Sequence, residues 1–160
     1  HGKPYLASST VRLPLQFNVS HSEECALIAL AHDLELGVDI EYMRPLDDMD
    51  AIARTVFSPH ERATLAALDG PRRHEAFYAC WARKEAYIKA IGRGLSFPLD
   101  NFDVALPPDE PPRLLAVRGN PAEVARWRYY LLPPVPDYAT ALAVESDAIE
   151  VKSWCWAGTA

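Results

Sequence analysis

The spacing of apolar and polar residues divides the chain into a β-rich beginning, a helical middle and a β-rich end. Short apolar or alternating runs bounded by turn-forming residues predict strands. A polar run over residues 20–24 predicts a turn between the first two of them. We expect strands at residues 15–19, 25–32, 36–41, 101–105, 113–117, 127–132, 138–144 and 149–155.

The middle of the chain has the spacing and the end signals of helices. A short helix is expected at residues 47–56. The sequence Ser58-Pro59-His60-Glu61 is a capping-box pattern with proline at the first helical position, and it predicts a second helix that ends near Leu68. A long helix is expected from Arg73 to Ile91, ended by Gly92. Helices packed on an antiparallel sheet define the α+β class.

Acidic and basic residues recur at informative positions in two of these elements. In the strand 36–41, Asp39 and Glu41 are two residues apart and therefore point to the same face, which we expect to be a cleft or surface because Val38 and Ile40 are apolar. In the long helix, Glu85 and Lys89 share a face. If the two faces meet, three carboxylates suited to Mg²⁺ converge with an ammonium suited to phosphate.

Each of these pairs also has an ordinary structural explanation. Two carboxylates on one strand face are common at exposed edges, and a Glu-Lys pair four residues apart is a common surface pair of a helix, worth a few tenths of a kcal/mol. Periodicity alone leaves these alternatives open.

Composition narrows the class of protein. The chain has 160 residues and a formal net charge of −6, which argues against general nucleic-acid binding. It contains no run of eighteen apolar residues, so we expect no membrane span. Its three cysteines are scattered, which suggests neither a zinc site nor a disulfide framework and is typical of a cytoplasmic protein.

Four blocks of sequence carry a resemblance to a known family. They are Gly2-Lys3-Pro4; Phe17-Asn18-Val19-Ser20-His21-Ser22; Gly37-Val38-Asp39-Ile40-Glu41; and Phe57-Ser58 followed by Trp81-Ala82-Arg83-Lys84-Glu85-Ala86, Lys89 and Gly92-Arg93-Gly94-Leu95-Ser96. In this order the blocks resemble the phosphopantetheinyl transferases of the surfactin-synthetase-activating type, from residue 2 to about residue 104 and more weakly to the end.

The resemblance implies an architecture of two similar halves, a pseudo-dimer. Family members usually have more than two hundred residues, and this chain opens at a block that normally lies late in the first half. We therefore expect residues 1–35 to be the end of an incomplete first half-domain and residues 36–160 to be a complete second half-domain that carries the metal site.

The resemblance also implies roles for individual residues. Asp39, Glu41 and Glu85 would bind Mg²⁺. Glu85 would act as general base on the acceptor serine, directly or through water, with Glu41 or bound water as alternatives. Lys89 would stabilise charge on the transferring phosphate.

Four further residues would contact coenzyme A by the same resemblance: Lys3, Ser20, His21 and Lys84. Without the surrounding block, His21 would be interpreted as an ordinary loop histidine, and Lys84 has the alternative of a solvated surface lysine. Three histidines match no family block and are expected to be structural or surface residues: His32, His60 and His74. Three tryptophans are expected in core or sheet packing rather than in ligand stacking: Trp127, Trp154 and Trp156.

The function implied is Mg²⁺-dependent transfer of 4′-phosphopantetheine from coenzyme A to a serine of an acyl or peptidyl carrier protein, with release of adenosine 3′,5′-bisphosphate. The carrier could belong to fatty acid, polyketide or nonribosomal peptide biosynthesis. An alternative is a truncated, non-catalytic module that binds coenzyme A or the carrier. A different Mg²⁺ phosphotransferase is less favoured because the chain has no glycine-rich phosphate loop.

By the same resemblance, residues 46–68 and the Gly94-Leu95 turn would form the carrier-docking surface. Arg54 and Arg62 would meet an acidic carrier helix. Met49 and Ile52 could serve either docking or the core, whereas Phe57 is expected in the core.

Overall fold

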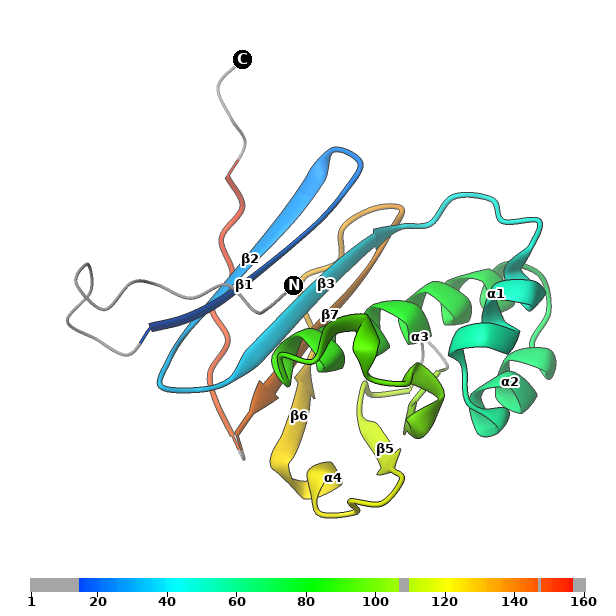
Figure 1. Ribbon diagram of the computed structural model, residues 1–160. Coiled ribbons are helices and arrows are strands. Elements are labelled where there is room, and N and C mark those ends of the chain that lie inside the picture. Colours follow the sequence, from blue (N-terminus) through cyan, green and yellow to red (C-terminus); the bar gives the residue numbers. More distant parts are fainter. Residues whose placement is uncertain (1–14, 107–109, 147, 157–160) are drawn as a thin grey trace.

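The computed structural model describes residues 15–106, 110–146 and 148–156, and it confirms the α+β class (Figure 1). The strands form three antiparallel sheets in the described part of the chain, with the orders β1-β2, β3-β7-β6 and β4-β5. Their bounds are Leu15–Ser22 (β1), Cys25–His32 (β2), Leu36–Tyr42 (β3), Phe102–Val104 (β4), Leu114–Val117 (β5), Trp127–Tyr130 (β6) and Tyr138–Glu145 (β7).

The helices gather on one side of the β3-β7-β6 sheet, where α3 runs across β3 and β7 and α1 and α2 lie toward one end (Figure 1). Their bounds are Met49–Val56 (α1), Pro59–Ala66 (α2), Gly70–Ala90 (α3) and Glu123–Arg126 (α4), with short 3₁₀ turns at Gly94–Ser96 (η1) and Leu99–Asn101 (η2). None of the helices in the described part of the chain combines the length and the apolar character needed to cross a membrane.

Most predicted elements are present within a few residues of their expected bounds, α4 was not predicted, and three other differences have a local explanation. Strand β1 continues to Ser22 instead of ending at residue 19, because the turn needs only Glu23 and Glu24, and Glu23 adopts a positive φ of 47°. Helix α3 begins at Gly70 rather than Arg73, since a proline fits the first helical turn. Residues 149–155 form no strand; Ile149 and Val151 instead pack on the apolar face of β3 and β7.

The predicted start of α2 and the predicted end of α3 are confirmed by their hydrogen bonds. The hydroxyl of Ser58 accepts a hydrogen bond from the Glu61 backbone N–H at 3.2 Å, and the Glu61 carboxylate accepts one from the Ser58 N–H at 2.8 Å, which completes a capping box. At the end of α3, Gly92 has a φ of 66°. The Arg93 N–H donates to Ile88 O and the Gly92 N–H donates to Lys89 O, which are the two hydrogen bonds of a Schellman motif.

The face of β3 that carries the carboxylates is covered by α3, because both sides of the contact are built from small residues. A Cβ atom on Gly37 would lie 2.1 Å from Ala86 O and 2.4 Å from Ala90 N. Next to β3, the alanines of β7 at positions 139, 141 and 143 pair with Glu41, Asp39 and Gly37 and are buried in the same core as α3. The expectation of a cleft or surface on this face was therefore wrong at Gly37 and Asp39, where the helix backbone lies directly on the strand, but it holds at Glu41, which lines a pocket.

The β1-β2 hairpin is joined to β3 through side chains. The backbone N–H groups of Val38, Ile40 and Tyr42 point away from β7, toward the hairpin. They donate to side-chain oxygens of Asn18, Ser20 and Ser22, at 2.9, 3.4 and 3.0 Å respectively. Every second residue of β1 from Asn18 to Ser22 thus supplies a side-chain acceptor where a neighbouring strand would supply a main-chain carbonyl. We refer to this row of three hydrogen bonds as the seam.

Candidate functional site

Three polar side chains from three elements meet where the seam passes under α3. Lys89 Nζ lies 2.6 Å from Asp39 Oδ1 and 2.9 Å from Ser20 Oγ, and the Ser20 hydroxyl donates to the same Asp39 oxygen at 2.8 Å. Asp39 is 2% exposed, whereas the Lys89 side chain is 27% exposed. The lysine therefore reaches from the surface to a buried carboxylate.

The position of Asp39 follows from the packing of β3. It alternates with Val38 and Ile40, which are buried on the opposite face. Gly37, two residues before it on the same face, permits the close approach of α3, which brings Lys89 within reach.

The other two predicted metal ligands flank this group. Glu41 accepts a hydrogen bond from Trp81 Nε1 at 3.1 Å and lines a pocket of about 260 Å³. Other residues of this pocket include Ser22, Arg44 and Tyr78. Glu85 lies one turn of α3 before Lys89, and its electrostatic neighbours are Asp39, Lys89 and Glu41. The two predicted faces do meet.

Burial weakens the acidity of all three carboxyl groups, and repulsion from neighbouring carboxylates adds to this for Glu41 and Glu85. The pKa of Glu85 is raised to about 7, first by burial and then by the nearby Asp39 and Glu41 carboxylates, against the lowering effect of Lys89. Burial also raises the pKa of Asp39, against the lowering effect of Lys89. For Glu41, burial and then Asp39 raise the pKa. A concentration of unfavourable negative charge beside a cavity is typical of functional sites.

The residues present fit a divalent cation in kind. Within the described residues, Asp39 Oδ2 is one of two buried side-chain polar atoms without a hydrogen-bond partner, and hard carboxylate oxygens suit Mg²⁺. No three such side chains in the described part of the chain are gathered closely enough to hold a metal as they stand. Glu41 is turned to Trp81 and Asp39 is bonded to Lys89, so both carboxylates have competing protein partners.

The structure does not bring Lys84 to this group. Its side chain is 1% exposed, and its ammonium contacts Leu99 O at 2.7 Å, Phe102 O at 2.8 Å and Glu61 Oε2 at 2.8 Å. An ammonium has three N–H donors, and here each has a protein oxygen. Neither a contact with a phosphate nor a solvated surface position, the two expectations for Lys84, agrees with this location.

The structure describes two of the other three residues that were predicted to contact coenzyme A. Ser20 is in the site, where it bonds both charged groups. His21, the next residue of β1, is exposed on the strand. Lys3 lies outside the described residues.

Two residues with polar contacts beside the site were not among the predicted site residues. Asn18 anchors the seam, and Trp81 holds Glu41. The alternation Asn18-x-Ser20-x-Ser22 was the available signal for the seam, since it places three short polar side chains on one strand face. No local pattern indicated the contact of Trp81 with Glu41.

Residues expected outside the site are divided between core and surface. Phe57 is fully buried and Trp127 is 2% exposed, as predicted, whereas Trp154 and Trp156 are 84% and 89% exposed, so their prediction as packed residues was wrong. Met49 and Ile52 are partly buried against the main core, and Arg54 is exposed.

Comparison with known proteins identifies the family of this chain. A family profile described as the 4′-phosphopantetheinyl transferase superfamily matches residues 35–143. The 4′-phosphopantetheinyl transferase HetI of Nostoc is 35% identical over 96% of this chain and 61% of its own length. A 4′-phosphopantetheinyl transferase of Bacillus subtilis is 41% identical over 68% of this chain and 46% of its own.

Solved structures agree on the fold. A holo-(acyl-carrier-protein) synthase from Bacillus anthracis, in complex with CoA (3′,5′-ADP), superposes with a TM-score of 0.54 at 23% identity, over 69% of this chain and 93% of that one. The chain spans about half to three fifths of the curated relatives named above. Since the profile covers more than half of the chain and includes Asp39, Glu41, Glu85 and Lys89, this chain belongs to the 4′-phosphopantetheinyl transferase superfamily.

Proposed function

We propose that the protein carrying this chain transfers 4′-phosphopantetheine from coenzyme A to a serine of an acyl or peptidyl carrier protein. The observation that carries the proposal is the junction of β1, β3 and α3. There, Ser20, Asp39 and Lys89 form one bonded group with Glu41 and Glu85 beside it, in a chain of this superfamily.

In the reaction, the serine oxygen of the carrier forms a bond to the phosphorus next to pantetheine. The bond from that phosphorus to the bridging oxygen of the pyrophosphate breaks, and adenosine 3′,5′-bisphosphate leaves. Glu85 accepts the serine proton. Glu85 lies beside Asp39 and Lys89, so its carboxylate is positioned to take this proton directly or through water.

Asp39, Glu41 and Glu85 are the residues that would hold Mg²⁺. When bound, Mg²⁺ neutralises pyrophosphate oxygens and orients the reacting phosphorus. Glu41 remains the alternative base to Glu85, and its bond to Trp81 Nε1 fixes one carboxylate oxygen.

Lys89 supplies positive charge to the transferring phosphate and the leaving group. Its side chain is partly exposed and reaches both Asp39 and Ser20, so the ammonium lies between the buried carboxylate and the solvent from which coenzyme A arrives. We place Ser20 with Lys89 as a coenzyme contact that also orients the site. We keep His21 as a coenzyme contact by the family resemblance, and its exposed side chain is accessible to a ligand.

The carrier would approach over residues 46–68 and the turn at Gly94, with Arg54 available to an acidic helix. This chain has a net charge of −6, so attraction of an acidic partner depends on local basic groups. None of the three cysteines, all in the described part of the chain, forms a disulfide, which supports a cytoplasmic protein.

The proposal is tested by the mass of an apo carrier protein after incubation with the natural protein, coenzyme A and Mg²⁺. We expect a gain of one phosphopantetheine group. We expect at least a 100-fold lower rate for Asp39→Asn and for Glu85→Gln, with the fold retained by circular dichroism. Glu110→Gln, which changes an exposed glutamate paired loosely with Arg113, is the matched control and should transfer normally.

A second measurement separates an enzyme from a binding module. A carrier whose acceptor serine is changed to alanine should gain no mass. If the natural protein binds coenzyme A tightly but never labels the unmodified carrier at saturating Mg²⁺, the non-catalytic alternative is correct. Near-normal transfer by folded Asp39→Asn and Glu85→Gln would contradict the assignment of the site.

A further inference from the structure

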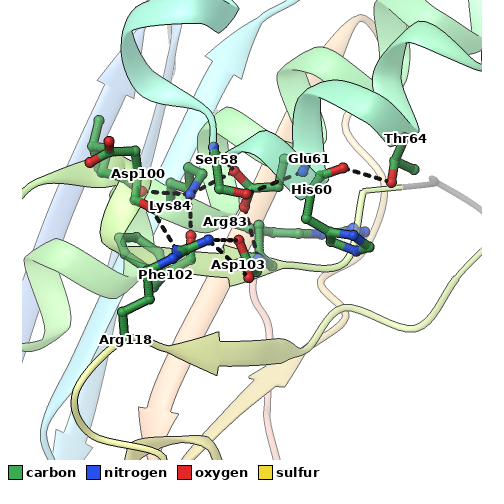
Figure 2. A network of polar contacts seen from close by, with 12 residues as sticks. Ser58, His60, Glu61, Thr64, Arg83, Lys84, Asp100, Phe102, Asp103 and Arg118 are labelled. Atoms are coloured by element: carbon green, nitrogen blue, oxygen red, sulfur yellow. Dashed lines mark hydrogen bonds and ion pairs between the residues drawn. The ribbon is translucent and has the colours of Figure 1, made fainter.

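A second network of buried charges lies on the other side of α3 from Asp39, and Figure 2 shows its members. Its centre is the ion pair between Glu61 of α2 and Lys84 of α3, which are 2.8 Å apart with side chains 0% and 1% exposed. Glu61 also accepts hydrogen bonds from Ser58 N at 2.8 Å and Val104 N at 2.9 Å. One carboxylate therefore links α2, α3 and β4.

The lysine of this pair is equally constrained. Its ammonium donates to the carbonyls of Leu99 in η2 and Phe102 in β4, and lies 4.1 Å from the centre of the Phe102 ring. These partners belong to η2, β4 and α2, not to α3. Rotation of α3 about its axis would therefore move the ammonium away from all of them together.

The residue before Lys84 is held in a similar way. The Arg83 guanidinium donates to Ala105 O at 2.5 Å, and the Tyr129 hydroxyl donates to Arg83 O at 2.6 Å. Arg83 is 5% exposed. Arg83 and Lys84 are thus both held by polar contacts. They come immediately before Glu85, which has Asp39 as an electrostatic neighbour.

Stability alone does not account for this arrangement. Burying an ion pair costs desolvation that its attraction barely offsets, and apolar residues of similar size are often as stable or more so. What a buried pair does provide is a single allowed orientation, since a small shift of either element separates the charges without solvation.

Orientation of α3 matters directly for the site. A side-chain group about 6 Å from the helix axis moves about 1 Å for a rotation of about 10°. Reacting groups need to be held within about 0.5 Å, and a misplacement of about 1 Å can cost about 100-fold in rate. The Glu61–Lys84 pair opposes such a rotation, together with the contacts of Arg83, on a face of α3 different from the one that meets Asp39.

We propose that Glu61 and Lys84 are positioning residues for the transfer reaction: their buried ion pair fixes the rotation of α3 and thereby places Glu85 and Lys89 against Asp39. This inference rests on the proposed function for its kinetic consequence, but its geometric consequence is independent of activity.

The test compares Glu61→Gln, Lys84→Met and the double variant, which carries no buried charge at either position. We expect each single variant to lose thermal stability, since one charge remains buried without its partner, and the double variant to recover most of that loss. In the double variant, kcat should stay at least 10-fold below that of the natural protein, while KM for the carrier stays within about twofold. A purely structural pair would instead recover kcat together with the melting temperature.

Two further measurements complete the test. The amide NMR shifts of Glu85 and Lys89 should differ between the double variant and the natural protein, and unchanged shifts would overturn the proposal whether or not the protein is active. Glu145→Gln is the matched control, because it breaks a partly exposed ion pair with Arg126 between β7 and α4, and it should leave both shifts and kcat unchanged. If the double variant does not fold, Glu61→Asp shortens the pair by one methylene and is judged by the same shifts. Absence of transfer by the natural protein would refute the proposed function and leave the shift measurement to decide on the pair.

Discussion

Ser20 shows how a single short side chain serves two purposes in this protein. Its oxygen accepts a hydrogen bond from Lys89, donates to Asp39, and receives the N–H of Ile40 across the seam. The hydroxyl group is suited to this because it combines one donor with two acceptor positions. The same atom thus holds the hairpin to the sheet and orients the charged pair of the site.

Replacement of this hydroxyl should therefore affect both stability and the site. We expect Ser20→Ala to lower the free energy of unfolding by about 1–2 kcal/mol, because Asp39 and the Ile40 N–H are left buried with fewer partners. Ser22→Ala, at the exposed end of the same seam, should cost about 0.5 kcal/mol or less. Urea denaturation of both variants measures the difference, and equal costs would show that the seam is not buried around Ser20.

A second prediction at this scale concerns the pH dependence of stability. Folding raises the pKa of Glu85 from 4.5 to about 7, so the folded state favours the protonated carboxyl. Its contribution to stability is complete below pH 4.5 and is lost as the pH rises to about 7. Glutamine mimics the protonated form, so Glu85→Gln should gain stability relative to the natural protein over this window and level off above it.

The measurement is thermal or urea unfolding of the two proteins between pH 4 and pH 8 without divalent cations. Glu110→Gln controls for the loss of one negative charge at an exposed position, and should show no such trend. A stability difference for Glu85→Gln that stays constant from pH 4 to pH 8 would mean that Glu85 titrates normally.

At the scale of elements, the central contact is the one between α3 and β3. The helix approaches the strand so closely because Gly37 has no side chain and its neighbours are alanines. This distance decides where Lys89 and Glu85 lie relative to Asp39. The geometry of the candidate site therefore depends on a residue that has no functional group.

A methyl group at Gly37 should push the helix away. We expect Gly37→Ala to destabilise the protein by about 3 kcal/mol and to reduce transfer severely, because the added carbon would meet backbone atoms of Ala86 and Ala90 that cannot rotate aside. Gly119→Ala is the control: nothing lies within 4 Å of the added carbon, and its positive φ of 81° should cost about 1 kcal/mol. Similar losses in the two variants, measured by urea denaturation, would contradict the close contact.

At the scale of the whole molecule, the β1-β2 hairpin has an unusual position. It pairs with β3 through side chains, and on its outer face Val19, Ile28 and Leu30 are 42%, 68% and 63% exposed. Val19 is paired with Ile28 and Phe17 with Leu30, so these residues form one apolar surface. The division into an end of a first half-domain, residues 1–35, and a second half-domain, residues 36–160, remains a prediction that this surface supports.

We expect a protein made of residues 1–160 alone to self-associate through this surface, because exposed apolar area of this kind is normally covered. Ile28→Lys should shift the population toward monomer in light scattering, whereas Leu131→Lys, at a leucine that is 78% exposed elsewhere, should not. Its affinity for coenzyme A, measured by calorimetry, should be weaker than micromolar. A monodisperse monomer that binds coenzyme A at about −8 kcal/mol or better would show that these residues are self-sufficient.

The sequence by itself determined the local features of this protein. Alternation predicted β3 with Asp39 and Glu41 on one face, and the capping box and Gly92 predicted the helix ends, because each depends on residues within a few positions of one another. The ordered blocks of residues around Ser20, Asp39 and Glu85 indicated the family. These signals were sufficient for the fold class and for most of the elements.

The tertiary structure alone decided which of two neighbouring lysines belongs to the site. Lys84 and Lys89 have the same chemistry and lie on one helix, yet Lys84 is buried against Glu61 and Lys89 bonds Asp39. It also decided that the carboxylate face is covered by α3. Both outcomes depend on which face of the helix meets the sheet and how closely. Those depend on contacts between residues far apart in the chain, such as Glu61 with Lys84 and Asp39 with Lys89, which no local pattern records.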